Sequence, residues 1–405
     1  MSHLQWIESM IDETVKNNGF YEDYCVKVHA ENAKGDNYGS DIAFVEVFSK
    51  NNEEKPVFNL FMKYLPLNVE FMEKFKQMPG LFKTEINIYT KIIPRYQELQ
   101  KQQNQPLMDF TPKCLYTKET GNNAVIVLEN IKPHGFTLHP KEKSMDSAHI
   151  RLLLKSLAQW HALSFVLKDQ YFEEFKKLNE THKVSPWGMI FETHLSKVYD
   201  YSHKALHQIL EETGEYDVLS KFKAKFKNLS AKEMMHSLLN NDKSEKHAIL
   251  IHGDCWNGNF MFQYIDQDHT EPTKVQILDF QIASLRSPIT DVSEFIYSTA
   301  SSEEFKNIRQ ILMEYYADLA RNIRALGSDP DQVFSFSDFK EQWHKYSIHG
   351  ITVALLAPVY LHLDDEPLDV ANEEAMFDIL PKQIAKPVVR KRMTDMAKCF
   401  ASFEF

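Results

Sequence analysis

The sequence predicts an α+β protein of two lobes, a small N-lobe built on an antiparallel sheet and a larger, mainly helical C-lobe. Strand-like segments gather before residue 130, whereas helical spacing of apolar residues dominates after residue 144. The chain has 405 residues, 43% of them hydrophobic and 25% charged, a composition typical of a globular protein with a large core. We expect the N-lobe at residues 1–129 and the C-lobe at residues 130–405.

The N-lobe is predicted to begin with a helix and to continue with strands. Apolar residues recur at helical spacing and stop before Gly19: Leu4, Ile7, Ile11 and Val15. Strands are expected where apolar residues alternate or cluster, at 24–29, 42–48, 57–65, 113–118 and 124–129. A long helix is expected between them, from about residue 71 to residue 99.

A glycine-containing turn joins the first two strands. Gly35 and Gly39 lie in this turn and Ser40 closes it, so backbone amides there could approach phosphate oxygens without a side chain in the way. A simple hairpin turn explains the same residues equally well. We take Asn37 and Ser40 as candidate contacts to a phosphate-bearing ligand.

Lys63 places a charge inside an otherwise apolar strand. Burying it without an anionic partner would be costly, and Glu85 on the long helix is the expected partner. Such a pair would present the lysine to nucleotide phosphates. Two plainer interpretations are a Lys63 side chain that reaches solvent and a Glu85 on an exposed helix face.

The strand at 124–129 runs into a polar segment with Pro133 and Gly135, where we place the lobe boundary. An adenine ring would bind backbone groups in this connection, so Glu129 and Ile131 are candidate nucleotide contacts.

Two acidic motifs in the C-lobe carry most of the chemical information. His252-Gly253-Asp254 is followed five residues later by Asn259, and Asp279-Phe280-Gln281 comes after a short hairpin. One carboxylate for an acceptor hydroxyl and two oxygen ligands for a metal are what phosphoryl transfer from a magnesium nucleotide requires. The alternative is a polar turn before a hairpin and a cap at the end of a strand.

The hairpin itself predicts a metal site. Residues 260–264 and 275–279 are both strand-like, and the polar stretch between them has loop character. If Tyr264 lies opposite Val275, Phe260 lies opposite Asp279, and Asn259 and Asp279 meet within about 5 Å. Mg²⁺ keeps waters and phosphate oxygens in its shell, so one amide and one carboxylate suffice.

Other polar residues of the C-lobe have structural interpretations. His161, in a helix expected at 144–167, is interpreted as a packed histidine rather than a catalyst. Asp291 with Glu294 fits a helix cap as well as an active-site role. Candidates to line an acceptor pocket are the tryptophans Trp160, Trp256 and Trp343.

Composition excludes several classes of function. The formal net charge of −11 argues against nucleic acid as a partner, because such binding depends on clustered Lys and Arg. No apolar run is long enough for a membrane span, and the N-terminal residues lack the pattern of a secretory signal. The four cysteines show no metal-ligand spacing. We expect a monomeric cytoplasmic protein without nucleic-acid or membrane partners.

In chain order these segments form a set that resembles known small-molecule kinases. The set consists of the glycine-containing turn at 35–40, Lys63, Glu85 on the long helix and the connection between the lobes at 127–131. It ends with the two acidic motifs, at 252–259 and 279–281. It is similar to the choline-kinase-like and aminoglycoside-phosphotransferase-like kinases. More narrowly, it looks like the ecdysteroid-kinase-like family of arthropods in four motifs: Gly35-Asp36-Asn37-Tyr38, Leu157-Ala158-Gln159-Trp160-His161-Ala162, His252-Gly253-Asp254-Cys255-Trp256 and Asp279-Phe280-Gln281.

The resemblance covers roughly residues 20 to 350 and implies a bilobal protein-kinase-like fold that uses ATP and Mg²⁺. By position it implies Asp254 as catalytic base, Asn259 and Asp279 as magnesium ligands, and Lys63, paired with Glu85, on the nucleotide phosphates. Gln281 stands where protein kinases have glycine, and this departure points away from protein substrates.

We therefore expect an ATP- and Mg-dependent phosphotransferase that acts on a small-molecule alcohol, and the resemblance suggests an ecdysteroid or related steroid. The alternative is a catalytically silent relative that binds nucleotide or an apolar ligand as a carrier or regulator. A third interpretation, Cys255 as a thiol nucleophile beside His252, lacks an orienting third group and an oxyanion site.

Overall fold

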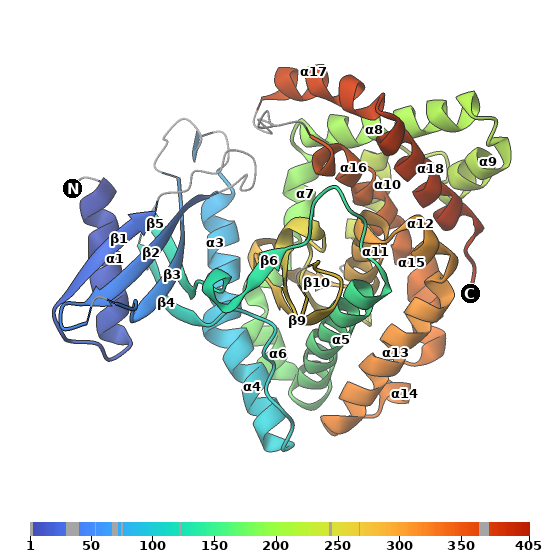
Figure 1. The fold of residues 1–405 in the computed structure, drawn as a ribbon. Coiled ribbons are helices and arrows are strands. Elements are labelled where there is room, and N and C mark those ends of the chain that lie inside the picture. The colour runs from blue at the N-terminus through green and yellow to red at the C-terminus, as the bar shows by residue number, and fades with distance from the viewer. Residues whose placement is uncertain are drawn as a thin grey trace.

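The computed structural model describes residues 3–29, 40–52, 54–66, 72–73, 76–120, 123–242, 245–266, 268–363 and 372–405 (Figure 1). It confirms the predicted architecture of a small antiparallel sheet followed by a larger, mainly helical part. The sheet has the order β1-β2-β3-β5-β4, with strands β1 (Tyr24–His29), β2 (Asp41–Ser49), β3 (Phe58–Tyr64), β4 (Cys114–Thr120) and β5 (Asn123–Glu129).

Helix α1 (His3–Asn17) covers one face of this sheet (Figure 1). Ile7, Ile11 and Val15, which were predicted from their spacing, are buried against alternate strand residues such as Leu60 and Met62. Because side chains alternate along a strand, Lys63 lies on the other face, away from α1. The sheet therefore presents its lysine toward the rest of the molecule.

The long helix predicted at 71–99 starts later and is interrupted. It comprises α3 (Met78–Asn87), a π-helical turn (Ile88–Ile92) and α4 (Ile93–Gln102). Pro94 follows the π turn; proline lacks an N–H and clashes with the preceding turn, and the wider turn accommodates it. Tyr96 of α4 packs on the buried Trp160 with ring centroids 5.0 Å apart, so α3 and α4 share the large core with the helical part.

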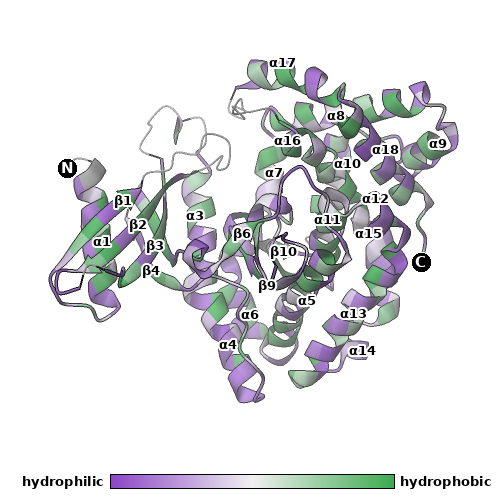
Figure 2. Cartoon of the chain, viewed as in Figure 1, coloured by the Kyte–Doolittle hydropathy of each residue, from purple (hydrophilic) through white to green (hydrophobic). Residues whose placement is uncertain are grey.

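The helical part is built around α5 (Ser147–Gln170), which begins at Asp146 as N-cap. Further helices of this part are α6 (Phe172–Leu178), α7 (Pro186–Phe191), α8 (Leu195–Glu212), α9 (Tyr216–Lys225), α10 (Ala231–Asp242), α11 (Pro288–Thr299), α12 (Ser302–Lys306), α13 (Ile308–Ala325), α14 (Pro330–Val333), α15 (Phe336–Ala354), α16 (Ala357–Leu361), α17 (Glu373–Ile384) and α18 (Pro387–Ser402). The outer helices α4, α8 and α13 alternate hydrophobic and hydrophilic residues along their length (Figure 2). In the described part of the chain, no helix combines the length and apolar character needed to cross a membrane.

Two small sheets lie within the helical part. Strand β7 (Ile249–Ile251) pairs with β10 (Ser284–Arg286), and β6 (Phe136–Leu138), β8 (Phe260–Tyr264) and β9 (Pro272–Ile277) form the other sheet. The predicted lobe boundary falls directly after β5, at the polar connection that leads into β6. Both acidic motifs follow strands of these small sheets, β7 and β9 respectively.

One close helix contact in this part depends on a glycine. A Cβ atom placed on Gly350 of α15 would lie less than 3.0 Å from the backbone of Ser293 in α11. The side chains that α11 and α15 carry near this point, including Glu294 and His349, can therefore approach one another.

Gly350→Ala is expected to lower the free energy of unfolding by about 1–3 kcal/mol, because the added methyl group overpacks two helices. Gly80→Ala is the matched control: Gly80 lies in α3, no heavy atom lies within 4 Å of the position that its new methyl group would take, and alanine favours a helix by up to about 1 kcal/mol. Urea denaturation of both variants compares them. Equal stability of the two variants would contradict the close α11–α15 contact.

Candidate active site

The loop that carries Asp254 turns sharply after β7. Gly253 has a φ of +89°, and a Cβ atom at this position would lie 2.6 Å from the carbonyl oxygen of Ile282. Only glycine satisfies both the left-handed backbone and the close approach. The glycine of the His252-Gly253-Asp254 motif thus sets the direction in which the next residue, Asp254, leaves the loop.

A buried carboxylate holds this loop in place. Asp291 accepts hydrogen bonds from the backbone N–H groups of His252 and Gly253, both at 2.8 Å, and from His161 Nε2 at 3.0 Å. Burial alone would raise the pKa of Asp291, but His161 and the N–H donors hold it below its usual value. Asp291 is therefore an ionised anchor for the loop that carries Asp254.

This finding corrects the capping interpretation of Asp291. The N-cap of α11 is Ser287, whose hydroxyl accepts from the Ile289 N–H, and Asp291 lies inside the helix with its side chain fully buried. The structural interpretation of His161 is confirmed: it is buried, and its Nδ1 lies 2.7 Å from the Tyr315 hydroxyl. His161 supports the Asp254 loop through its contact with Asp291.

His252 connects the two acidic motifs. The Asp254 N–H donates to His252 Nδ1 at 3.2 Å, so in the neutral ring Nε2 carries the hydrogen and donates to the Leu278 carbonyl at 2.8 Å. The ring also packs against Phe280 with centroids 4.8 Å apart. One buried imidazole therefore ties the Asp254 loop to the segment that ends at Asp279.

Asp254 is held by its own loop. Asn259 Nδ2 donates to the Asp254 carboxylate at 2.8 Å and to its carbonyl at 2.9 Å, and the Trp256 indole also donates to the carboxylate. Burial, followed by the negative charge of Asp279, raises the pKa of Asp254 to about 6. A carboxylate with a pKa near 6 is ionised at neutral pH and is a stronger proton acceptor than an exposed one.

The hairpin register differs by two residues from the predicted one. Phe260 pairs with Ile277, not Asp279, and β9 runs from Pro272 to Ile277. The Leu278 N–H donates to the Asn259 carbonyl at 2.9 Å, so Asp279 comes one residue past the last paired position. A shift of two residues keeps the side chains from Phe260 to Gln263 on their predicted faces, and Asn259 and Asp279 still lie at the same end of the hairpin.

Asp279 has left-handed backbone geometry, with φ +62° and ψ +65°. Aspartate tolerates this conformation better than most residues. The next residue, Phe280, is buried against Trp160 with ring centroids 5.0 Å apart, which fixes the turn. The Asp279 side chain remains partly exposed, at 22%.

The ion pair predicted between Lys63 and Glu85 is present at 2.7 Å, with both side chains buried. The sequence did not predict a second partner, Asp279, whose carboxylate accepts from the same Nζ at 2.5 Å. Burial alone would lower the pKa of Lys63, but the charges of Asp279 and Glu85 raise it above its usual value. Lys63 is therefore a permanent cation between α3 and the second acidic motif.

The remaining predicted nucleotide contacts are placed only in part. Asn37 lies outside the described residues. Ser40 precedes β2, and its buried hydroxyl has no hydrogen-bond partner among the described residues. The carbonyl of Ile131 accepts from His134, whereas its N–H has no acceptor within the described part of the chain. The side chain of Glu129 pairs with His134 at 3.2 Å.

A cavity of about 260 Å³ adjoins Asp254. Its lining is mainly aromatic and aliphatic and includes Trp187, Tyr199 and Trp256. Of the three predicted tryptophans only Trp256 lies here: Trp160 is in the core, and Trp343 borders a different cavity near the C-terminus. Trp187, which the sequence analysis missed, also donates to the Gly253 carbonyl at 3.0 Å and so supports the loop.

The thiol interpretation is contradicted by the surroundings of Cys255. The side chain is fully buried, and burial together with the charges of Asp291 and Glu294 raises its pKa well above the usual value. A thiolate nucleophile is therefore disfavoured at this position.

Comparison with known proteins identifies the family of this chain. Residues 34–328 match the family described as the ecdysteroid kinase-like family. This chain belongs to the ecdysteroid kinase-like family. The match lies within the roughly 20–350 over which the sequence motifs predicted the resemblance, and it includes Lys63, Asp254 and Asp279.

Two solved structures are distantly similar to this ecdysteroid kinase-like protein. A protein described as a putative fructosamine-3-kinase, from Haemophilus somnus 129PT, has 10% identity and a TM-score of 0.38, with 96% of each chain covered. An aminoglycoside-3'-phosphotransferase of type VIII has 12% identity and a TM-score of 0.33, with 81% of this chain and 93% of that chain covered. A search of curated proteins found no significant match.

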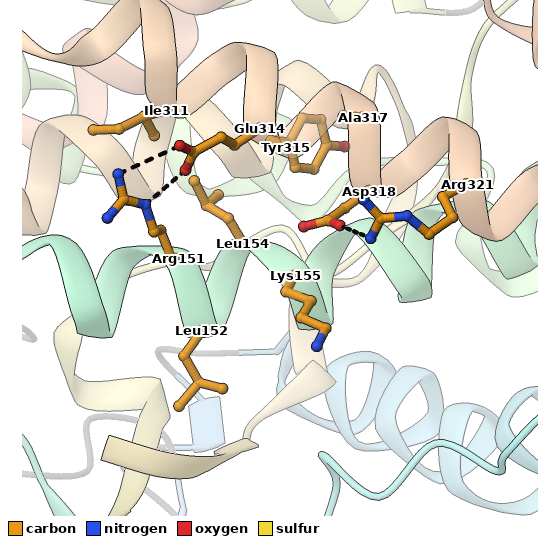
Figure 3. A pocket seen from close by; sticks show the side chains of 10 residues that line it. All are labelled: Arg151, Leu152, Leu154, Lys155, Ile311, Glu314, Tyr315, Ala317, Asp318 and Arg321. Atoms are coloured by element: carbon orange, nitrogen blue, oxygen red, sulfur yellow. Dashed lines mark hydrogen bonds and ion pairs between the residues drawn. The ribbon is translucent and has the colours of Figure 1, made fainter. Parts of the chain in front are cut away.

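Another surface cavity, of about 420 Å³, lies between α5 and α13 (Figure 3). Four of its charged side chains form two ion pairs: Arg151 binds Glu314 at 2.6 Å, and Arg321 binds Asp318. None of the candidate site residues lines it. This cavity is therefore separate from the candidate active site.

Asp291→Ala is expected to cost about 3 kcal/mol or more of unfolding free energy, because it leaves two buried N–H groups of the catalytic loop without an acceptor. Asp318→Ala, which removes an acid paired with the exposed Arg321, is the control and should cost less than about 1 kcal/mol. Denaturant unfolding followed by circular dichroism provides the comparison. If both variants lose the same small amount, Asp291 does not anchor the loop.

Proposed function

We propose that this protein is an ATP- and Mg²⁺-dependent kinase that phosphorylates a hydroxyl group of a small-molecule alcohol. The observation that carries the proposal is the position of Asp254: its carboxylate borders a mainly apolar cavity and is hydrogen-bonded to Asn259 at the same end of the hairpin as Asp279. A base beside an acceptor cavity and two oxygen-bearing side chains next to it are the parts that phosphoryl transfer needs.

The residues at this hairpin end fit a magnesium ion. Asn259 directs its amide nitrogen at Asp254, which leaves its side-chain oxygen as the group available to a metal, and Asp279 supplies a carboxylate. No three His, Cys, Asp or Glu side chains of the described residues form a metal cage. Mg²⁺ bound mainly through waters and phosphates needs no such cage, and when bound it would neutralise charge on the transferred phosphoryl group.

The nucleotide site would lie between the sheet and the hairpin. Lys63, held by Glu85, would contact the phosphates, and the buried Ser40 hydroxyl is an unsatisfied donor at the start of β2. The free N–H of Ile131 and the carbonyl of Glu129 would bind the adenine edge. Beside them Ile131, Phe136 and Met261 form a small apolar cluster with Leu278, on which a base could stack.

Asp254 would orient the acceptor hydroxyl and accept its proton. The hydroxyl oxygen forms a bond to the terminal phosphorus of ATP, the bond from that phosphorus to the bridging oxygen breaks, and ADP leaves. The proton passes to the Asp254 carboxylate, whose buried position and pKa of about 6 suit this transfer at neutral pH.

The acceptor would be an apolar alcohol, and the family suggests an ecdysteroid or related steroid. The cavity of about 260 Å³ lies just below the roughly 300–1,000 Å³ typical of pockets for drug-sized ligands, so it would hold one end of a steroid. The net charge of −11 supports a small-molecule substrate rather than nucleic acid. We propose that the protein acts as a monomer in the cytoplasm.

The reaction is tested by incubating the protein with ATP, Mg²⁺ and a panel of alcohols that includes ecdysteroids, and by searching for phosphate adducts by mass spectrometry. Asp254→Asn is expected to lower turnover at least 10²- to 10³-fold, because it removes the base while preserving the shape of the side chain. Cys255→Ser should keep the activity. Turnover in Asp254→Asn equal to that of the wild type would refute the assignment of the base.

Metal dependence separates the kinase from a silent binding protein. ATP at 100 times its dissociation constant should stabilise the wild type by about 2.7 kcal/mol, and the shift should need Mg²⁺ and shrink with EDTA or in Asp279→Asn. Thermal unfolding with ATP, with and without Mg²⁺, measures this. Mg-dependent stabilisation of the wild type without a phosphorylated product from any alcohol would favour the carrier or regulator.

A further inference from the structure

The cavity beside Asp254 contains a second acid that the proposed reaction does not use. Glu294 lies on α11, three residues after Asp291, and is 3% exposed. It lines the cavity together with Asp254 and Gln281. A carboxyl group buried in a mainly apolar cavity requires hydrogen-bond partners.

Among the described residues, one of the two carboxyl oxygens of Glu294 lacks a hydrogen-bond partner. The backbone N–H of Cys255 donates to the carboxyl group, which couples Glu294 to the catalytic loop. The Oε2 atom of Glu294 is buried and has no hydrogen-bond partner among the residues that the structure describes. Burial, and then the charges of Asp254 and Asp291, raise the pKa of Glu294 well above its usual value.

His349 of α15 faces this unsatisfied oxygen. Arg286 donates to His349 Nδ1 at 3.3 Å, and since a guanidinium group has no acceptor, Nδ1 must be the accepting nitrogen. Burial, followed by the charge of Arg286, lowers the pKa of His349 well below its usual value, so the ring is neutral and its hydrogen is on Nε2. Nε2 lies 3.6 Å from Glu294 Oε2, too far for a hydrogen bond.

The donor at His349 Nε2 and the acceptor at Glu294 Oε2 determine which group can bind between them. A hydroxyl can accept from His349 Nε2 and donate to Glu294 Oε2, whereas an ammonium group can only donate and would meet the N–H of His349. Gln281 adds a second acceptor, because its buried Oε1 also has no partner among the described residues. Most of the remaining lining, including Leu81, Trp187 and Ile282, is apolar, and Gln77 and Ser298 add polar groups to it.

We propose that Glu294, held by the Cys255 N–H and next to His349, binds a second hydroxyl of the acceptor, separate from the hydroxyl that is phosphorylated, and that Gln281 assists it. The acceptor is then an apolar molecule with several hydroxyl groups, rather than a simple alcohol or a cationic amino alcohol. This inference rests on the proposed function, because it assigns the cavity beside Asp254 to the acceptor.

Binding without ATP tests the inference independently of turnover. Trp187 and Trp256 line the cavity, so tryptophan fluorescence reports its occupation. The probes are ecdysone, which has several hydroxyls, pregnenolone, a steroid with a single hydroxyl, and choline. We expect the wild type to bind ecdysone more tightly than pregnenolone and not to bind choline.

Glu294→Leu should weaken ecdysone binding roughly tenfold or more and leave pregnenolone binding unchanged, because it removes one buried hydrogen-bond acceptor. Gln281→Leu, at a less buried position, should act in the same direction and covers the case in which Glu294→Leu does not fold. Glu245→Gln is the control, since Glu245 is a buried acid outside the cavity, paired with Lys345. It should leave both steroid affinities unchanged.

The outcomes separate the two proposals. If the wild type prefers ecdysone and the variants lack this preference, while no alcohol is phosphorylated, the result would refute the proposed kinase activity and support the hydroxyl subsite. The subsite would be overturned if the wild type does not bind ecdysone or binds both steroids equally. It would also be overturned if choline binding depends on Glu294, or if the variants do not change the preference for ecdysone.

Discussion

The loop that carries Asp254 depends on one buried carboxylate. Asp291 has no exposed surface, and it accepts the N–H groups of His252 and Gly253 on one side and the imidazole of His161 on the other. Because the N–H groups of two consecutive residues are fixed, the position of the next residue, Asp254, is fixed as well. Because α11 also carries Glu294, the same helix positions both the proposed base, Asp254, and the polar end of the cavity proposed for the acceptor.

The second constraint is the shared lysine. Lys63 comes from the sheet, Glu85 from α3 and Asp279 from the turn after β9, and the three charges meet with little solvent access. A buried cation between two carboxylates is strongly destabilised if either partner is removed, so the contact fixes the sheet relative to the hairpin. In this structure Lys63 binds Asp279, the carboxylate proposed as a ligand of Mg²⁺. When a nucleotide is bound, its phosphates would replace part of the contact between Lys63 and Asp279.

Local patterns predicted much of this arrangement. The five strands of the first sheet were predicted to within two residues at each end, because their apolar alternation matches the period of a strand. The Lys63–Glu85 pair followed from the cost of an unpaired charge in a buried strand. Asn259 and Asp279 lie at the same end of the hairpin, as predicted, although the predicted pairing of its strands was wrong by two residues. A shift of two residues leaves each side chain on the same face of the sheet.

What the sequence did not predict depends on contacts between distant segments. Asp291 fits a helix cap by its spacing, and only the packing of α11 against the loop after β7 shows that it binds N–H groups from residues far earlier in the chain. The approach of His349 to Glu294 requires the close α11–α15 contact at Gly350. Tryptophan content does not reveal which indole faces a cavity, and Trp187 was missed for that reason.

The most direct measurement is a crystal structure with Mn²⁺ and a non-hydrolysable ATP analogue, with the metal located by its anomalous signal. We expect the ion to be bound by the side-chain oxygens of Asn259 and Asp279, with Lys63 on the phosphates and Asp254 facing the cavity lined by Trp187 and Trp256. A nucleotide bound elsewhere, or a metal that contacts neither Asn259 nor Asp279, would contradict this expectation.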